Sequence, residues 1–178
     1  NSATRNPQYQ ELYVRWMQFG AFTPMMRSHG ADIYRELYYF GKQGEPVYDA
    51  LVDAVKLRYR FLPYIYSQSW QVTAHHDSFM RALFMDFKED KQTWDNNRQY
   101  LFGHNVLVCP VVDPLYTQEK IVKTDPMSGW DKQNLQRETY APVDWKTEKT
   151  FSVYLPAGAQ WYDYWTNTRI DGGQTLTA

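Results

Sequence analysis

Apolar residues recur every three or four positions in the first part of the chain, as they do on one face of a helix. Leu12 and Trp16 belong to such a pattern, which predicts a helix over residues 11–20. Residues 1–10 are polar and contain Pro7, so we expect them to form a loop before this helix. The first predicted element is therefore a short amphipathic helix.

The longest periodic segment opens at Pro46 and runs to about Ala74. A proline is well suited to the first turn of a helix, but Pro63 falls inside the pattern and should kink the helix or divide it in two. Residues 23–27 form a short apolar run, which predicts a buried strand, and residues 30–45 show no period and are predicted to be a loop. The first part of the chain thus combines helices with one strand.

Short β-type runs separated by turn residues replace the helical period beyond about residue 80. The predicted strands are 83–87, 100–102, 106–112, 150–155 and 160–164. Residues 120–147 are polar and aperiodic, so they are predicted to be a long loop or insertion. The change of pattern predicts a boundary near residues 74–80, dividing the chain into residues 1–78 and residues 79–178.

The composition is that of an ordinary globular protein, with 178 residues, 43% hydrophobic and 22% charged. A net charge of −1 gives no electrostatic reason to expect nucleic acid as a partner, and no apolar stretch is long enough to span a bilayer. Aromatic residues make up 17% of the chain. Tyrosine and tryptophan suit stacking on sugar rings, but they also fill protein cores, and composition alone favours the core.

The single cysteine, Cys109, rules out an intrachain disulfide and a cysteine-rich zinc site, and we expect neither a metal nor a cofactor. Cys109 sits in an apolar run, so we expect it to be a small buried side chain. The N-terminus carries neither an initiating methionine nor the apolar core of a signal peptide. We therefore expect a chain that was processed or cut from a longer one.

Hydrolysis of a glycosidic bond needs two carboxyl groups about 5–10 Å apart. Asp32 and Glu36 lie close in sequence, yet in a charged loop an ion pair with Arg35 or Arg27 is the expected role. The remaining candidate carboxylates cluster near the predicted boundary, and none has an evident partner. They are Asp86, Glu89 and Asp90. The residues alone therefore predict no catalytic pair.

The four histidines differ in their surroundings. His75 and His76 are predicted to cap a helix end, and His104 follows a glycine in a predicted turn. His29 stands at the C-terminal end of the predicted strand, between Arg27 and Gly30. That end of a barrel strand is where active-site residues gather in α/β barrels, which makes His29 the leading candidate.

Four segments together resemble glycoside hydrolase family 31. They are RWMQFGAFTPMMRSHG (15–30), YRFLPYIY (59–66), YLFGHNVLVCPV (100–111) and VYLPAG followed by WYD and WT (153–166). The segments occur in the order of the family and cover most of the chain. The loop from Ser28 to Glu36 is similar to that of the α-xylosidases acting on xyloglucan fragments.

The resemblance implies the closing strand and helices of a (β/α)8 barrel, followed by an antiparallel β-sandwich domain. It implies a retaining α-glycosidase that removes terminal α-linked xylose or glucose from oligosaccharides, with an aspartate nucleophile and an aspartate acid/base upstream of this chain. The missing upstream part of the same polypeptide is thus an expected partner, beside the oligosaccharide substrate. A periplasmic or secreted location is compatible with the family.

Two site residues map onto the family motif. His29 corresponds to the histidine that hydrogen-bonds ring hydroxyls of the terminal sugar, and Arg27 to a supporting arginine beside it. The segment 120–147 is longer than the usual connection in the family, and its Trp130 and Trp145 would suit a loop near the substrate, although a surface loop is the simpler expectation.

Two alternatives remain open from the sequence. The chain could be a non-catalytic carbohydrate-binding module in which Trp161, Tyr162 and Trp165 form a flat, exposed stacking surface. It could also be a purely structural β-domain that supports a barrel. The exposure of those three rings separates the first alternative from the others.

Overall fold

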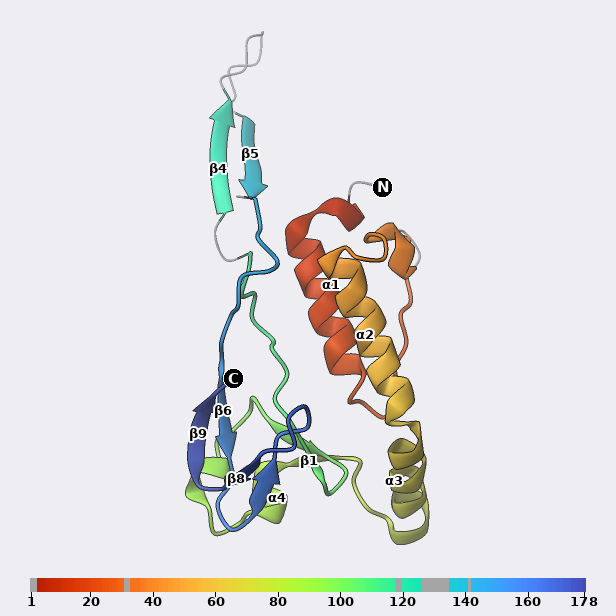
Figure 1. The fold of residues 1–178 in the computed structure, drawn as a ribbon, viewed down its shortest axis with the longest axis vertical. Helices are drawn as coiled ribbons and strands as arrows, with labels where there is room; N and C mark the ends of the chain where they lie inside the picture. Colours follow the sequence, from red (N-terminus) through yellow and green to blue (C-terminus); the bar gives the residue numbers. More distant parts are fainter. Residues whose placement is uncertain (1–2, 31–32, 118–119, 126–134, 141) are drawn as a thin grey trace.

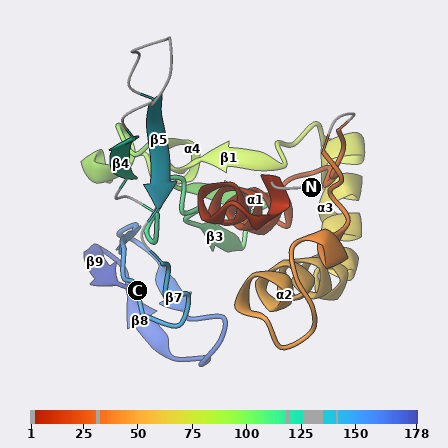
Figure 2. The same cartoon turned by 90° about the horizontal axis from the view of Figure 1, so that it is seen from above.

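The computed structural model describes residues 3–30, 33–117, 120–125, 135–140 and 142–178. Helices come first along the chain and antiparallel strands afterwards, as predicted (Figure 1). The main helices are α1 (Pro7–Gly20), α2 (Pro46–Arg60) and α3 (Leu62–His75), with short helical turns at η1 (Ala3–Arg5), η2 (Leu37–Tyr39), α4 (Leu83–Asp86) and η3 (Lys91–Thr93). The helices α1 and α2 pack side by side, and α3 continues beyond the end of α2 (Figures 1 and 2).

The helix α1 begins earlier than the sequence pattern predicts. Asn6 caps it, because its Oδ1 accepts hydrogen bonds from the backbone N–H groups of Gln8 at 2.9 Å and Tyr9 at 3.2 Å. Pro7 occupies the first helical position, where its missing N–H costs nothing. The prediction of a loop over residues 1–10 was therefore wrong from Pro7 onward, since this proline starts the helix.

Pro63 divides the long periodic segment in two, as predicted. The helix α2 ends at Arg60, and Pro63 stands in the first turn of α3. At the other end, His76 adopts a left-handed conformation with φ of 58°, which terminates α3. The predicted fading of the helix near Ala74 agrees with this end.

The predicted strand over residues 23–27 does not form. Residues 21–25 make turns and bends after α1, and residues 26–30 run without a paired strand among the described residues. A strand needs a neighbouring strand to complete its ladder of hydrogen bonds. Here the side chain of Arg58 in α2 donates instead to the backbone carbonyls of Ala21, Thr23 and Pro24. The apolar run was recognised, but its conformation was not.

Within the described residues the strands form four small antiparallel sheets. The largest has the order β1-β2-β3, and the others are the pairs β4-β5, β6-β9 and β7-β8. Their bounds are β1 Met80–Ala82, β2 Tyr100–Phe102, β3 Val106–Val108, β4 Lys120–Asp125, β5 Leu135–Tyr140, β6 Ser152–Leu155, β7 Gln160–Tyr162, β8 Arg169–Asp171 and β9 Gln174–Thr177.

Several strand predictions need correction. Residues 83–86 are helical (α4) and not a strand, because β1 ends at Ala82 and the chain turns there. The strand predicted over 106–112 stops at Val108, just before Pro110, which has no N–H for a ladder.

The predicted loop 120–147 contains the hairpin β4-β5, which extends away from the other elements (Figure 1). The strands predicted at 100–102, 150–155 and 160–164 correspond to β2, β6 and β7.

Two hydrophobic clusters hold the chain together. The first lies between α1 and α2 and consists of Tyr13, Met17, Phe40, Val47, Leu51 and Ala54. Trp145, in the segment 120–147, packs against this cluster and is part of the core. Trp130 lies outside the described residues. The second joins α3 to the three-stranded sheet through Ile65, Phe102 and Val108. Phe102 is fully buried and is therefore the centre of this contact.

Polar side chains add links between distant segments. The amide of the buried Gln99 donates to the carbonyl of Tyr154 at 2.8 Å and accepts from its N–H at 2.9 Å, so that it imitates a neighbouring strand. The hydroxyl of Tyr64 donates to the carbonyl of Phe102 at 2.7 Å. A Cβ at Gly103 would lie 2.4 Å from that hydroxyl oxygen, so the turn between β2 and β3 needs glycine there.

Candidate functional site

The segment carrying Arg27 and His29 leaves the end of α1 and lies at the surface. The arginine Arg58 fixes its start: Nη1 donates to the carbonyl of Ala21 at 3.1 Å and also to that of Thr23, and Nη2 donates to that of Pro24 at 2.9 Å. Partial burial lowers the pKa of Arg58. These contacts hold the turn that leads into the candidate residues.

Tyr13 holds the segment from the other side. Its hydroxyl donates to the carbonyl of Arg35 at 2.7 Å, and it lies 2.7 Å from Ser28 Oγ. One hydroxyl has one proton, so Ser28 donates to Tyr13. The ring of Tyr13 is buried and stacks on Phe40 with centroids 4.3 Å apart. Burial raises the pKa of Tyr13, which keeps the hydroxyl protonated. A rigid phenol thus ties both sides of the loop that contains His29.

His29 and Arg27 lie next to each other. Arg27 Nη2 is 3.2 Å from His29 Nδ1. Because a guanidinium group only donates hydrogen bonds, this contact makes Nδ1 the acceptor and leaves the ring proton on Nε2. Both residues line a hollow of about 490 Å³ that also includes Trp16 and Arg35. The imidazole therefore offers an N–H donor, and the hollow adds a cationic and an aromatic wall.

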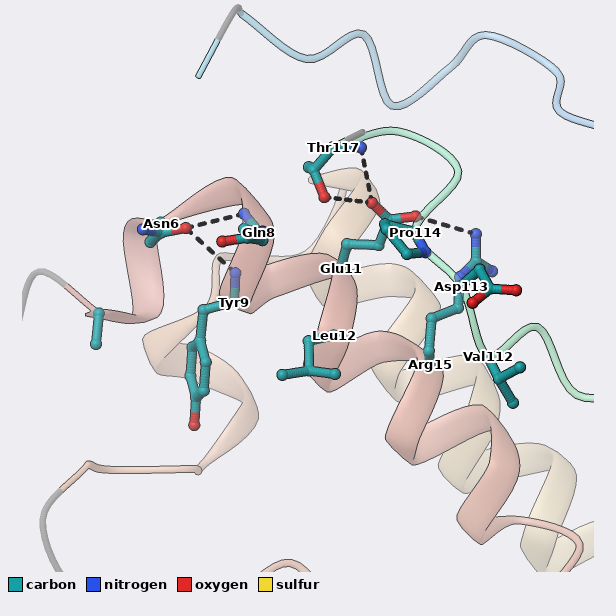
Figure 3. A pocket seen from close by; sticks show the side chains of 11 residues that line it. Asn6, Gln8, Tyr9, Glu11, Leu12, Arg15, Val112, Asp113, Pro114 and Thr117 are labelled. Carbon is teal, nitrogen blue, oxygen red and sulfur yellow. Dashed lines mark hydrogen bonds and ion pairs between the residues drawn. The ribbon is translucent and has the colours of Figure 1, made fainter. Parts of the chain in front are cut away.

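A second hollow of about 380 Å³ lies between the start of α1 and residues 112–117 (Figure 3). Its buried carboxylate, Glu11, accepts hydrogen bonds from the N–H groups of Leu115 at 2.6 Å, Tyr116 at 3.1 Å and Thr117 at 2.9 Å, and from the Thr117 hydroxyl at 2.7 Å. Arg15 Nη2 is 3.6 Å away. Burial opposes ionisation of Glu11, but these hydrogen bonds outweigh it and lower its pKa. A carboxylate so fully occupied is structural and not a general acid.

Two carboxylates that the sequence offered as candidates, Asp86 and Asp90, make structural contacts. Asp86 pairs with Arg81, with Nε to Oδ2 at 2.8 Å. Asp90 accepts from the Tyr154 hydroxyl at 2.6 Å and from the N–H of Ala157 at 2.8 Å. Asp32 lies outside the described residues. The partners of Asp86 and Asp90 are an arginine, a tyrosine hydroxyl and a backbone N–H, so these two carboxylates serve the fold.

The other histidines have local partners or are exposed. His104 Nε2 bonds to Asp77, and this bond is the main cause that holds the pKa of Asp77 below its ordinary value. His75 makes an edge contact with Trp70, and His76 is exposed at the end of α3. Within the described part of the chain no group of three or more histidine, cysteine or acidic side chains is arranged to hold a metal ion.

No helix among the described residues is long and apolar enough to cross a membrane. Cys109 has no disulfide partner in the described structure and lies 3.9 Å (Sγ to O) from the carbonyl of Ser152. Cys109 is half-buried, and burial raises its pKa, which disfavours the nucleophilic thiolate.

The three rings of the alternative binding surface do not share one environment. Trp161 is half-buried, donates from Nε1 to the carbonyl of Pro156 at 3.0 Å and packs against Phe87. Tyr162 and Trp165 are exposed, and Trp165 meets Tyr164 edge-on at 83°. Trp161 is therefore part of the packing of the β-domain, which weakens the case for a flat row of these rings.

Sequence reasoning proposed His29 and Arg27, whose role in binding stays a prediction. It did not point to the three residues that hold the surrounding structure, Glu11, Tyr13 and Arg58. Each acts through a partner at least 15 positions away in sequence. The one available signal was chemical: Glu11 is a charged residue that follows the helical pattern on the buried side of α1.

Comparisons with known proteins match one family over nearly the whole chain. Residues 3–68 match the family model described as the glycosyl hydrolases family 31 TIM-barrel domain, and residues 76–130 and 139–178 match the family 31 C-terminal domain. An α-xylosidase of Saccharolobus solfataricus is 30% identical over 174 residues, which is 96% of this chain and 19% of that protein. An α-glucosidase of Bacillus thermoamyloliquefaciens is 30% identical over 92% of this chain and 16% of its own length.

Solved structures give the same result. The crystal structure of a family 31 α-xylosidase from Xanthomonas citri superposes with a TM-score of 0.73 at 34% identity, covering 97% of this chain and 15% of that one. A family 31 dextranase of Flavobacterium johnsoniae, solved with glucose, gives 0.69 at 29% identity over 95% of this chain and 17% of its own. The chain therefore spans less than a fifth of the length of these relatives.

Proposed function

Because the chain belongs to glycoside hydrolase family 31, as the end of the catalytic barrel followed by the C-terminal β-domain, we propose that it forms part of a retaining α-glycosidase acting on oligosaccharides. The substrate class is terminal α-linked xylose or glucose, as in xyloglucan fragments. Within these residues the contribution to the reaction is binding and orientation of the terminal sugar. The nucleophile and the acid/base belong to the larger part of the relatives' length that has no counterpart here.

One observation carries the assignment of the sugar contact. Arg27 occupies Nδ1 of His29, so Nε2–H is left as the donor of this exposed side chain. A donor in this fixed tautomer suits a sugar hydroxyl. Its hydrogen bond can strengthen as the ring flattens toward the oxocarbenium-like transition state, which makes the contact useful for rate as well as for binding. The same reasoning gives Arg27 a positioning role.

We expect D-xylose to perturb the imidazole signals of His29 saturably in the NMR spectrum of the 178-residue chain. The three other histidines serve as internal references, because they lie on other elements. Xylitol, which has the same hydroxyls without the ring, is the matched ligand control. Equal shifts at all four histidines, or equal responses to xylose and xylitol, would contradict a specific sugar contact. Arg27→Met should reduce the response of His29 without unfolding the chain, because it frees Nδ1.

We expect the chain by itself to hydrolyse neither an aryl α-xyloside nor an aryl α-glucoside above the rate without protein. Hydrolysis needs two carboxyl groups across the scissile bond, and the carboxylates of Glu11, Asp86 and Asp90 are engaged in structural contacts. Release of the aryl leaving group is measured by absorbance. Sustained turnover that survives repurification would show that the acid/base pair lies within these residues.

A further inference from the structure

Arg35 lines the hollow that contains His29, and its guanidinium group is largely unengaged. Both residues belong to the hollow of about 490 Å³, and no acidic side chain is among the described residues that line it. Within the described part of the chain, the guanidinium makes one hydrogen bond, from Nη1 to the carbonyl of Ile33 at 3.4 Å. A guanidinium has five N–H groups, so most of its donors remain for a ligand in the hollow.

Two contacts fix the position of Arg35 relative to His29. The backbone carbonyl of Arg35 accepts a hydrogen bond from the Tyr13 hydroxyl at 2.7 Å, and the same hydroxyl oxygen is 2.7 Å from Ser28 Oγ, in the residue before His29. The guanidinium lies against Gly30, the residue after His29, in the space that a Cβ there would occupy. Arg35 is thus held to the chain on both sides of His29.

Gly30 provides space and not an unusual backbone conformation. It is not among the glycines with a positive φ, so an alanine could adopt the same backbone. The atoms that an alanine Cβ would meet are Cζ, Nη1 and Nη2 of Arg35, which form the far end of a flexible side chain. Gly30→Ala should therefore move the guanidinium away at little cost in stability. The missing side chain at position 30 leaves room for Arg35 beside His29.

We propose that Arg35 is a second sugar-binding residue of this hollow, donating hydrogen bonds to hydroxyls of the ring that His29 contacts, and that Tyr13 and Gly30 position it. The proposal rests on the proposed function, because it takes the sugar contact of His29 as given. A guanidinium presents its N–H groups in a rigid planar fork, which suits two neighbouring oxygen atoms of one ring. His29 supplies a single N–H, so Arg35 adds the contacts that fix the orientation of the ring.

The test measures the affinity of the 178-residue chain for D-xylose by saturation-transfer NMR titration. Arg35→Met removes the donors and keeps an unbranched side chain, and it should weaken binding about fivefold, as expected for the loss of one net hydrogen bond. Arg60→Met is the matched control and should leave the affinity unchanged, because Arg60 is exposed on α2 and does not line the hollow. A near-ultraviolet circular dichroism spectrum checks the fold of each variant.

A double-mutant cycle tests whether Gly30 acts through Arg35. Gly30→Ala should weaken xylose binding about as much as Arg35→Met does, because it displaces the same guanidinium. In the Arg35→Met background Gly30→Ala should have little further effect, since methionine lacks the atoms that the Cβ would meet. Additive effects would overturn the positioning role of Gly30. Tyr13→Phe keeps the ring on Phe40 but removes the hydroxyl, and it should also weaken binding.

His29→Ala separates failure of this proposal from failure of the proposed function. If His29→Ala abolishes xylose binding while Arg35→Met and Gly30→Ala bind as the wild type does, the role of Arg35 is overturned and that of His29 stays. If Arg35→Met weakens binding and His29→Ala does not, the sugar contact of His29 is overturned and that of Arg35 stays. Absence of xylose binding to the wild-type chain would overturn both.

Discussion

Glu11→Ala is expected to lower the free energy of unfolding by about 3 kcal/mol, because it leaves several buried donors without an acceptor. The N–H groups of Leu115, Tyr116 and Thr117 and the Thr117 hydroxyl all point at this carboxylate. Glu11 is 3% exposed, so water cannot take its place without opening the contact between α1 and this loop. Urea unfolding followed by circular dichroism measures the change.

The matched control is Glu89→Ala, which removes an exposed carboxylate and should change the unfolding free energy by less than about 0.5 kcal/mol. The pH dependence offers a second reading. The pKa of Glu11 is lower in the folded chain than in the unfolded chain, so its contribution is complete above the unfolded value and is lost as the pH falls through the folded value. The difference between wild type and Glu11→Ala should therefore shrink in acid. A difference independent of pH would contradict the role of the charged form.

Phe102→Ala is expected to cost about 3–5 kcal/mol, the range for deleting a large buried aromatic side chain. Phe102 is fully buried and touches rings from three other segments: Phe79 with centroids 4.7 Å apart, Phe22 at 6.1 Å and Tyr64 at 6.2 Å. Its removal therefore opens a cavity at the contact between the helices and the three-stranded sheet. Thermal and urea unfolding both report the loss.

Phe102→Leu separates the cavity from the loss of aromatic contacts, because leucine refills much of the space; it should cost clearly less than the alanine variant. Phe84→Ala is the exposed control, since Phe84 is 49% exposed on α4. If Phe102→Ala unfolds with the same midpoint as Phe84→Ala, the two halves do not depend on this contact.

The elements that sequence predicted well are those whose signal is local. Pro63 divides a periodic segment whatever surrounds it, and the β2 run is marked by its own β-type residues before the turn at Gly103. Pro7 was misinterpreted, because a proline in a polar stretch fits a loop as well as a first helical turn, and only the cap by Asn6 decides between them. The hairpin β4-β5 was missed because its polar strands lack the alternation that a half-buried strand shows.

The candidate site follows the same rule. His29 and Arg27 could be proposed from the sequence because they lie in a motif of neighbouring residues, and their role stays a prediction. Arg58 could not be found, because its acceptors are backbone carbonyls 34 to 37 positions away, and carbonyls leave no mark in a sequence. The failed strand at 23–27 has the same origin: the apolar pattern records burial, whereas strand conformation depends on a partner strand. The division near residues 74–80 stays a prediction.

The span of the Glu11 contact has a consequence for the synthesis of the chain. The carboxylate and the first of its donors, Leu115, are 104 positions apart. The helix α2 ends at Arg60, which is 55 positions before Leu115. At a translation rate of about 5–20 residues per second, α1 and α2 can therefore pair for about 3–11 s before those donors leave the ribosome. During that interval the Glu11 carboxylate has not yet met these donors. The pair of α1 and α2 therefore forms first, and its contact through Glu11 is completed only when residues 115–117 have been made.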